Sequence, residues 1–308
     1  MKPRKFTDLA ASVRQRLLDI SRRTKTDANL IWTRYAVERL LYRLASSEHA
    51  SEFVLKGAML FTVWTREPYR PTLDLDLLGF GEDSAERVAS VFRRLCGTEV
   101  EPDGLVFNAD SVRVEPTRGD LEYGGQRVAL VAYLGKARIP LRVDIGFGDV
   151  VTPRAEKALY PTLLDFPAPH VRTCTRETVV AEKLQAMVTL GIANSRMKDF
   201  YDLFVLSTGF VFEGRVLSSA IQATFERRKT PVPAEAPPAL CDDFAADRAK
   251  VTQWNAFLRK SGLEDTVPPL AEVVARLRAF LLPPLSSLAA QGDEAASRMT
   301  WARGGPWR

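Results

Sequence analysis

The chain has 308 residues, 46% of them hydrophobic, and a formal net charge of +5. This length can bury a core in one large domain or two. No apolar run approaches the roughly 20 residues needed to cross a bilayer, and the start has no apolar signal region, so we expect a cytoplasmic protein without a membrane segment. With only two histidines and three scattered cysteines, disulfide frameworks, Cys/His zinc sites and His-based triads are disfavoured. Any chemistry must use carboxylates, Lys and Arg.

Positive charge is concentrated at the N-terminus. Residues 1–50 contain eleven Lys or Arg against five Asp or Glu, and the rest of the chain is close to neutral. The spacing of apolar residues predicts amphipathic helices over 7–24 and about 29–45. Five arginines are expected on the free faces of these helices: Arg14, Arg16, Arg34, Arg39 and Arg43. These cations either form ordinary solvated surfaces or make residues 1–50 a basic arm that binds RNA.

The most informative stretch of the chain covers residues 72–79. Leu alternates there with Asp, so a strand would send Asp74 and Asp76 to the same face. Two carboxylates in this arrangement lie roughly 7 Å apart along the strand. Their oxygens are the ligands that Mg²⁺ prefers. Taken alone, the pattern is also typical of an edge strand whose aspartates merely face water.

Two flanking segments strengthen the metal-site interpretation. Upstream, a Lys-Gly-Ala turn at 56–58 joins a predicted buried strand to a predicted helix, and glycine at such a junction lets backbone N–H groups approach a phosphate. Downstream, residues 139–147 alternate again and put Asp144 on the polar face of a second strand. If the strands are neighbours, three carboxylates converge beside a phosphate-binding turn. That arrangement describes a two-metal phosphoryl-transfer site.

The remaining pattern predicts an α+β fold. Short alternating runs between 105 and 147, broken by glycines, predict a mixed sheet with helices against one face. A proline-containing connection follows over 153–170, and nearly everything beyond it reads as helical. We therefore expect a helical N-terminal arm over 1–50, a mixed-sheet core over 51–170 and a helical C-terminal lobe over 171–308.

The lobe contains further candidate residues. In its first predicted helix, Lys183 falls inside the apolar arc. It either snorkels past the rim or points at an anion, and we favour the anion because an unpaired ammonium is costly to bury. Asp202 lies in the next predicted helix. Asp199 in the same helix is expected instead to be a packing partner of Arg196 or Lys198.

These motifs together resemble a known family. The order of Gly57, Asp-Leu-Asp at 74–76 and Asp144 resembles the DNA polymerase β type nucleotidyltransferases. The fuller pattern adds Leu-Lys-Gly-Ala at 55–58 and Arg-Met-Lys-Asp-Phe-Tyr-Asp-Leu at 196–203. It resembles the AbiEii toxin family, which includes the MenT toxins, over about residues 8–209. One departure is Ala58, which stands where these enzymes usually carry Gly or Ser and supplies no hydroxyl to a phosphate.

The resemblance implies a polymerase β-like nucleotidyltransferase core that moves a nucleoside monophosphate from an NTP to a hydroxyl and releases pyrophosphate. It further implies a two-ion Mg²⁺ site, a bacterial toxin acting on the 3′ end of tRNA or a related RNA, and a cognate antitoxin protein encoded nearby. The implied metal ligands, which are also catalytic residues, are Asp74, Asp76 and Asp144; Lys183 and Asp202 are also catalytic, and Lys56, Gly57, Ala58 and Lys183 bind the nucleotide.

Three rival functions remain open at this point. An antibiotic-type small-molecule nucleotidyltransferase would share the metal site but would need an acidic pocket for a cationic acceptor. A glycosyltransferase with an Asp-x-Asp motif fits less well, because it would lack the preceding glycine turn and the third aspartate. The chain could also be a catalytically silent RNA-binding or partner-binding module, an interpretation that Ala58 leaves open.

Overall fold

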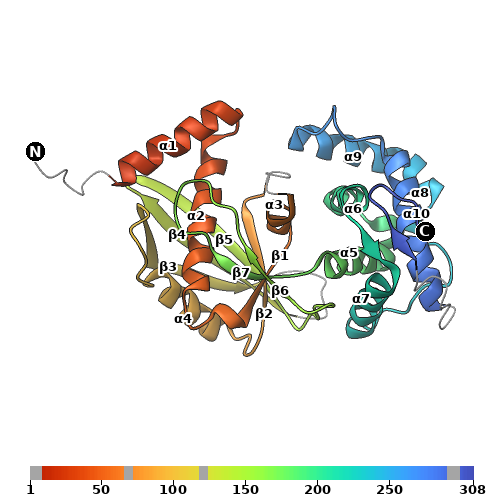
Figure 1. The fold of residues 1–308 in the computed structure, drawn as a ribbon, viewed down its shortest axis with the longest axis horizontal. Helices are drawn as coiled ribbons and strands as arrows, with labels where there is room; N and C mark the ends of the chain where they lie inside the picture. The colour runs from red at the N-terminus through yellow and green to blue at the C-terminus, as the bar shows by residue number, and fades with distance from the viewer. Residues whose placement is uncertain (1–8, 66–71, 118–123, 290–298) are drawn as a thin grey trace, which may run out of the picture. The chain divides into compact units, whose positions relative to one another are not determined.

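The structure is a computed structural model that describes residues 9–65, 72–117, 124–289 and 299–308. The chain divides into two compact units, which are described separately. The first contains residues 1–148 and 156–173, and the second contains residues 149–155 and 174–308. The N-terminal helices belong to the first unit together with the sheet (Figure 1).

A seven-stranded mixed sheet forms the centre of the first unit. Its strand order is β3-β4-β5-β2-β1-β7-β6. The pairs β2–β5 and β1–β7 are parallel, and the other pairs are antiparallel. The predicted α+β class with a mixed sheet is therefore confirmed. The strands are β1 (Phe53–Lys56), β2 (Asp74–Gly79), β3 (Leu105–Pro116), β4 (Gly125–Leu134), β5 (Ala137–Phe147), β6 (Glu156–Leu159) and β7 (His170–Thr173).

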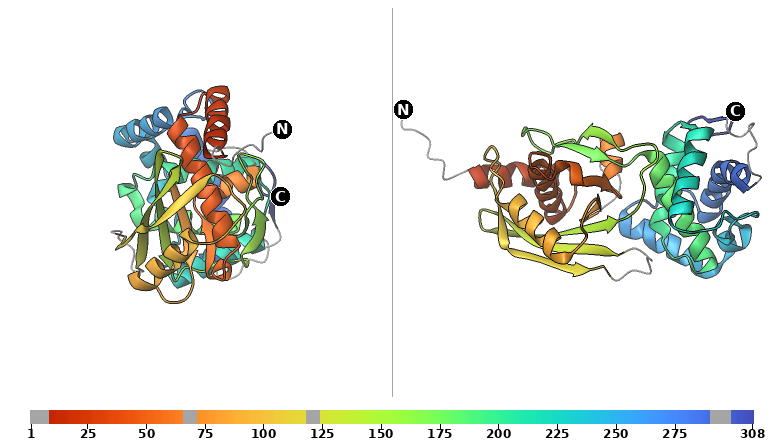
Figure 2. Two further views of the ribbon diagram at one scale, coloured as in Figure 1. Left: turned by 90° about the vertical axis from the view of Figure 1, so that its left-hand side faces the viewer. Right: turned by 90° about the horizontal axis from the view of Figure 1, so that it is seen from below.

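Helices pack on one face of this sheet. The described helices of the unit are α1 (Leu9–Thr24), α2 (Ala28–Ala45), α3 (Met59–Thr65) and α4 (Ala85–Cys96), with a 3-10 turn, η2, at Ala50–Glu52. Helix α4 contacts β3 and β4, and α2 contacts β5 and β7 (Figures 1 and 2). The alternation in the strands explains this packing, because Leu75, Leu77, Val143 and Ile145 are all buried on that face. Each such side chain contributes about 1.5–3 kcal/mol by leaving water, and the polar positions between them fall on the other face.

Two local features differ from the sequence-based expectation. Strands β6 and β7 lie in and at the end of the stretch predicted as a connection over 153–170. Each has only four residues, and β6 is an edge strand with mostly exposed side chains, so it shows no apolar alternation to read. Leu73, expected to share the apolar face, precedes β2 and is 53% exposed.

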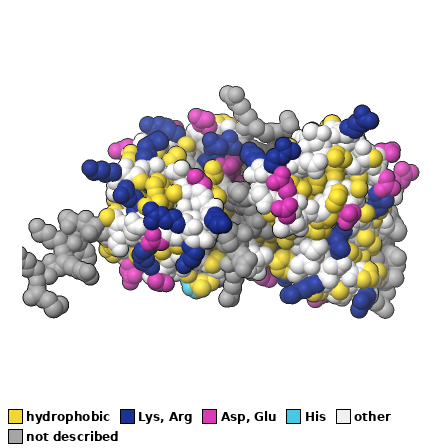
Figure 3. All heavy atoms as spheres, turned by 90° about the horizontal axis from the view of Figure 1, so that it is seen from above, with side chains coloured by type: hydrophobic (Ala, Val, Ile, Leu, Met, Phe, Trp, Pro, Cys, Tyr) yellow, Lys and Arg dark blue, Asp and Glu magenta, His cyan; other side chains and the backbone are white. Residues whose placement is uncertain are grey.

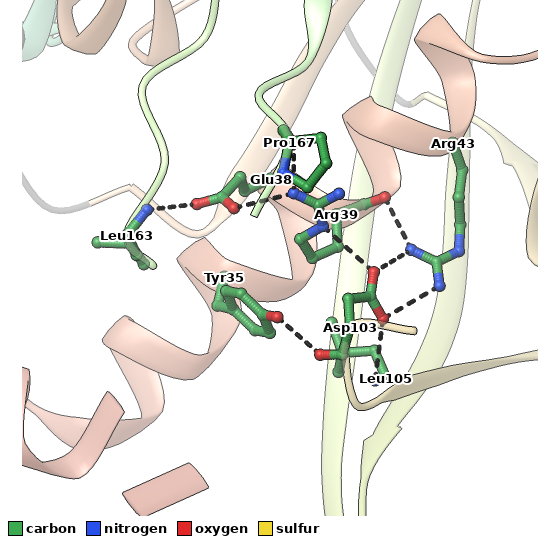
Figure 4. Close-up of polar contacts among 8 residues, drawn as sticks. All are labelled: Tyr35, Glu38, Arg39, Arg43, Asp103, Leu105, Leu163 and Pro167. Atoms are coloured by element: carbon green, nitrogen blue, oxygen red, sulfur yellow. Dashed lines mark hydrogen bonds and ion pairs between the residues drawn. The ribbon is translucent and has the colours of Figure 1, made fainter. Parts of the chain in front are cut away.

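Helix α2 corrects the predicted basic arm. Arg39 and Arg43 were expected on a free helix face, but their exposures are 1% and 5%. Arg39 Nε lies 3.2 Å and Arg43 Nη1 2.7 Å from Asp103 Oδ2 (Figure 4). Asp103 is itself buried where the chain enters β3, so both guanidiniums are drawn inward to satisfy its charge. Neither arginine is available to contact RNA.

The remaining arm cations are more accessible. Arg14 and Arg16 on α1 are exposed, and Arg16 Nη2 lies 2.9 Å from Asp165 Oδ2. Burial lowers the pKa of Arg34, although Tyr160 and Glu38 act in the opposite direction. On the face drawn in Figure 3, Lys and Arg side chains are interspersed with acidic and hydrophobic ones. The surface cations that remain on α1 form a smaller set than the sequence indicated.

The second unit is helical. Its elements are α5 (Arg176–Leu190), η3 (Gly191–Ala193), α6 (Met197–Gly209), β8 (Phe212–Glu213), α7 (Gly214–Arg227), η4 (Pro238–Leu240), α8 (Asp242–Ala246), α9 (Arg248–Ser261), α10 (Leu270–Ala289) and β9 (Thr300–Trp301). The C-terminal segment docks through its tryptophans. Trp301 Nε1 donates to the backbone oxygen of Ser207 at 2.7 Å, and Trp307 Nε1 donates to that of Phe280 at 3.0 Å. Across the described ranges, no helix combines the length and apolarity needed to span a bilayer.

Candidate functional site

Two of the three predicted metal ligands lie directly side by side. Strands β2 and β5 are parallel neighbours, and their register pairs Asp76 with Asp144 and Asp74 with Arg142. Paired residues of adjacent strands point to the same face, about 4.8 Å apart between the strands. Asp76 and Asp144 therefore form an acidic pair on the polar face of the sheet, with Asp74 one pleat further along. Like charges placed directly opposite each other are destabilising unless a cation compensates them.

The glycine turn lies against this acidic pair. Gly57 has φ +70°, a conformation that favours glycine. A Cβ atom at position 57 would also lie only 1.9 Å from Asp76 Oδ2. Lys56, the residue before the turn, is the register partner of Asp76 across β1 and β2. The Lys56–Gly57 turn and the Asp76 carboxylate thus form one contiguous surface, which the sequence had suggested without fixing the contact.

A charged row crosses five strands through the acidic pair. Register pairs each member with the next: Glu115 on β3, Arg127 on β4, Asp144 on β5, Asp76 on β2 and Lys56 on β1. Because consecutive pairs share a face, the row has alternating blocks of charge on the polar side of the sheet. Arg127 was not singled out in the sequence. The available signal was the inward alternation of its neighbours Val128 and Leu130, which places position 127 on the polar face.

Arg127 engages the third aspartate. Its Nε and Nη2 donate to Asp144 Oδ1 and Oδ2 at 2.6 and 2.8 Å, a bidentate pair. The hydrogen bond to Asp144 raises the pKa of Arg127. Arg142 Nη1 lies 3.7 Å from Asp74 Oδ1. Two of the three predicted ligands therefore have an arginine beside them.

The donor set suits a hard divalent cation. Carboxylate oxygens are the ligands that Mg²⁺ prefers, and the register places two of them next to each other. Within the described ranges, however, no three acidic, His or Cys side chains are gathered closely enough to hold a metal ion. The three aspartates do not gather around one point because Asp144 and Asp74 are turned toward arginines. A cation that used all three carboxylates would have to replace these arginine contacts.

Lys183 lies in a buried ionic cluster within the second unit. Its Nζ is 2.6 Å from Asp199 Oδ1 and 2.8 Å from Asp202 Oδ2, and both aspartate side chains are 1% exposed. Burial acts to lower the pKa of Lys183, but the two carboxylates outweigh it and the pKa is raised. Arg196 Nε lies 2.7 Å from Asp199 Oδ2, as predicted. The anion expected beside Lys183 is thus supplied by helix α6.

The fold and these side chains together define a class. A mixed sheet with paired aspartates on neighbouring strands, beside a Lys-Gly turn, is the arrangement that the resemblance to nucleotidyltransferases led us to expect. The family described as the nucleotidyl transferase AbiEii toxin of type IV toxin–antitoxin systems matches residues 39–276. This match covers most of the chain, so the chain belongs to that family and is a nucleotidyltransferase of the toxin–antitoxin type.

One solved structure supports the fold. The chain is similar to MenT4, a nucleotidyltransferase toxin from Mycobacterium tuberculosis, with a TM-score of 0.52 and 18% identity over 91% of this chain and 98% of MenT4. It is also similar to JHP933 from Helicobacter pylori, with a TM-score of 0.48 and 14% identity over 88% of this chain and 93% of JHP933. No curated protein sequence matches the chain.

Proposed function

We propose that this nucleotidyltransferase moves a nucleoside monophosphate from an NTP to the 3′ end of tRNA in a Mg²⁺-dependent reaction, as the cytoplasmic toxin partner of a cognate antitoxin protein. The attacking 3′-hydroxyl loses its proton and forms a bond to the α-phosphorus while the bond to pyrophosphate breaks. Membership of the AbiEii family supports the toxin role. The name of MenT4 supports nucleotide transfer by a protein of this fold.

The observation that carries the proposal is the position of the acidic pair. Asp76 and Asp144 are register partners on parallel strands, and the carboxylate of Asp76 lies against the Cα of Gly57. A phosphate-binding turn and two carboxylates on one surface can hold a nucleotide triphosphate together with its counter-ions.

Each residue has a proposed role. Asp74, Asp76 and Asp144 would hold a pair of Mg²⁺ ions, which neutralise phosphate charge and lower the pKa of the attacking hydroxyl. The Lys56–Gly57–Ala58 turn would bind phosphate oxygens through its backbone N–H groups, with no hydroxyl from Ala58. Lys183 in the second unit keeps the catalytic role that the family resemblance implies. Asp202, 2.8 Å from its Nζ, would orient the ammonium and keep it protonated.

We propose that the acceptor is RNA and that fewer arginines contact it than the sequence suggested. Arg39 and Arg43 are excluded because they pair with buried Asp103. Arg14 and Arg16 on α1 remain exposed. A few Lys or Arg contacts to phosphates give affinity without sequence specificity, so tRNA selection would have to come from contacts at its 3′ end.

The test is transfer of label from each of the four α-labelled NTPs to bulk tRNA with Mg²⁺. We expect one or two NTPs to label the RNA 3′ end with equimolar release of pyrophosphate. Label transferred to an aminoglycoside but not to RNA would favour the small-molecule nucleotidyltransferase. Absence of transfer to any acceptor, with retained binding of RNA, would favour the catalytically silent module.

A further inference from the structure

Arg127 stands between two acidic residues on an open face of the sheet. Its register partners are Asp144 on one side and Glu115 on the other. Its side chain is 44% exposed, while that of Asp144 is 25% exposed. The guanidinium is therefore held by contacts with neighbouring side chains rather than by burial, and it can change partners without disturbing the core.

The contact with Asp144 uses both carboxylate oxygens. Nε and Nη2 of Arg127 reach Oδ1 and Oδ2 at 2.6 and 2.8 Å. In this state Arg127 offsets the repulsion between Asp144 and its neighbour Asp76. A divalent cation bound to Asp144 would need the same oxygens. Guanidinium and cation therefore compete for one carboxylate.

We propose that Arg127 is an exchangeable counter-ion of Asp144. It holds the carboxylate while no cation is bound, and when a divalent cation takes its place it donates its planar fork to a phosphate group of the bound substrate. The inference rests on the proposed function, because it takes Asp144 as a metal ligand. A phosphate is the fitting new partner, since its oxygens match the bidentate donors of arginine as a carboxylate does, and metal ions held by the acidic pair would bring substrate phosphates to this face.

The chain offers a matched control on the same strand face. Arg138 on β5 is exposed and shares the polar face with Asp144. It lies six residues away, about 20 Å along the strand, which exceeds the Debye length of about 8 Å at physiological ionic strength. Arg138→Gln therefore removes the same charge without reaching the acidic pair. Arg127→Lys keeps the charge of Arg127 but loses the bidentate fork.

The experiment compares two affinities by titration of the metal-free protein. In the first, Mn²⁺ alone is titrated and followed by its electron paramagnetic resonance signal. Arg127→Gln should bind Mn²⁺ more tightly than wild type, on the order of fivefold, whereas Arg138→Gln should match wild type. In the second, tripolyphosphate is titrated at saturating Mn²⁺, and Arg127→Gln should bind it about tenfold more weakly. Arg127→Lys should fall between wild type and Arg127→Gln in both titrations.

Opposite signs in the two titrations are the signature of exchange, because a merely structural arginine would not tighten one ligand and weaken the other. A single-stranded oligoribonucleotide titrated at saturating Mn²⁺ replaces tripolyphosphate in a parallel arm, and the ligand that is weakened identifies the phosphate as that of the nucleotide or of the acceptor. Unchanged Mn²⁺ affinity in Arg127→Gln, or unchanged affinity for both phosphate ligands, overturns the proposal. Asp76→Asn distinguishes failure of the proposed exchange from failure of the proposed function. If it binds Mn²⁺ as wild type does, the metal site of the proposed function fails.

Discussion

The carboxylate of Asp76 occupies the space into which a side chain at position 57 would project. A Cβ on Gly57 would meet Asp76 Oδ2 at 1.9 Å and Asp76 Cγ at 2.6 Å. Glycine is required there for a second reason, because φ at this position is +70°. The turn and the aspartate are thus fitted to each other, and a change in one displaces the other.

Gly57→Ala should therefore remove activity and cost stability. The added methyl group must displace the Asp76 side chain from its position beside Asp144. The backbone strain adds about 1–2 kcal/mol to the loss of stability. We expect nucleotide transfer to fall at least about a hundredfold, since even the outer partners of metal ligands cost 10–100-fold when changed. Thermal unfolding and transfer kinetics measure the two effects.

Gly146→Ala on β5 is the matched control for that substitution. An added Cβ at position 146 would meet no atom of the described residues within 4 Å, and φ there is not in the left-handed region. Its transfer rate and unfolding midpoint should stay near those of wild type. If Gly57→Ala behaves in the same way as Gly146→Ala, the close contact between turn and carboxylate has no functional role.

Lys183 should prove structurally necessary within the second unit. Lys183→Met keeps the length of the side chain but leaves Asp199 and Asp202 buried beside no ammonium. Breaking a buried pair in this way costs roughly 3–5 kcal/mol, whereas the exposed Lys198→Met should cost under about 0.5 kcal/mol. Denaturant unfolding compares the two. The double variant Lys183→Met/Asp202→Asn should recover part of the loss, and its failure to do so would mean that the carboxylates do not depend on Lys183.

Glu38 should give the protein a pH-dependent stability. Burial raises the pKa of Glu38 to about 7 from 4.5, although the Leu163 N–H and Arg39 both act to lower it (Figure 4). Because the folded protein binds this proton more tightly than the unfolded chain, the stability is fully present below about pH 4.5 and is lost as pH rises through about 7.

Relative to Glu38→Gln, wild type should lose roughly 3 kcal/mol of unfolding free energy across that range. Urea unfolding of both proteins at several pH values measures this difference. A constant difference between wild type and Glu38→Gln from pH 4.5 to 8 would show that Glu38 titrates normally in the folded protein.

Mutations of the buried and of the exposed arginines in the N-terminal helices should have clearly different effects on stability. Arg43→Ala leaves buried Asp103 with only Arg39 as its cation and should cost roughly 3 kcal/mol. Arg14→Ala on the exposed face of α1 should change stability by under about 0.5 kcal/mol. Chemical denaturation of both variants provides the comparison. Similar stabilities for the two would contradict the buried position of Arg43.

The alternation of apolar and polar residues in the strands predicted one part of the site from the sequence. Residues 73–77 and 139–147 alternate so regularly that the faces of Asp76 and Asp144 followed from periodicity. Their direct pairing did not, because register between distant segments depends on the whole sheet order. Arg127 was passed over for the same reason: its place beside Asp144 comes from a hairpin register that no single strand reveals.

The burial of these charged side chains could not be predicted from the sequence for a different reason. Helical spacing shows which positions share a face, but Arg39 and Arg43 look like surface cations until Asp103, about 60 residues away in sequence, is brought next to them. Lys183 was expected near an anion, and the structure supplies two from α6. In both cases a long-range ionic partner outweighed the usual preference of charged side chains for water.

We propose that Asp76 and Asp144 are both required for nucleotide transfer to RNA. The most direct measurement compares transfer of label from NTP to tRNA by wild type, Asp76→Asn, Asp144→Asn and Asp110→Asn, at saturating Mg²⁺ and with folding checked by circular dichroism. Asp110 is an exposed carboxylate on β3 of the same sheet. We expect Asp76→Asn and Asp144→Asn each to lose at least about a hundredfold in rate, while Asp110→Asn transfers as wild type does. Wild-type rates in either Asp76→Asn or Asp144→Asn would contradict it.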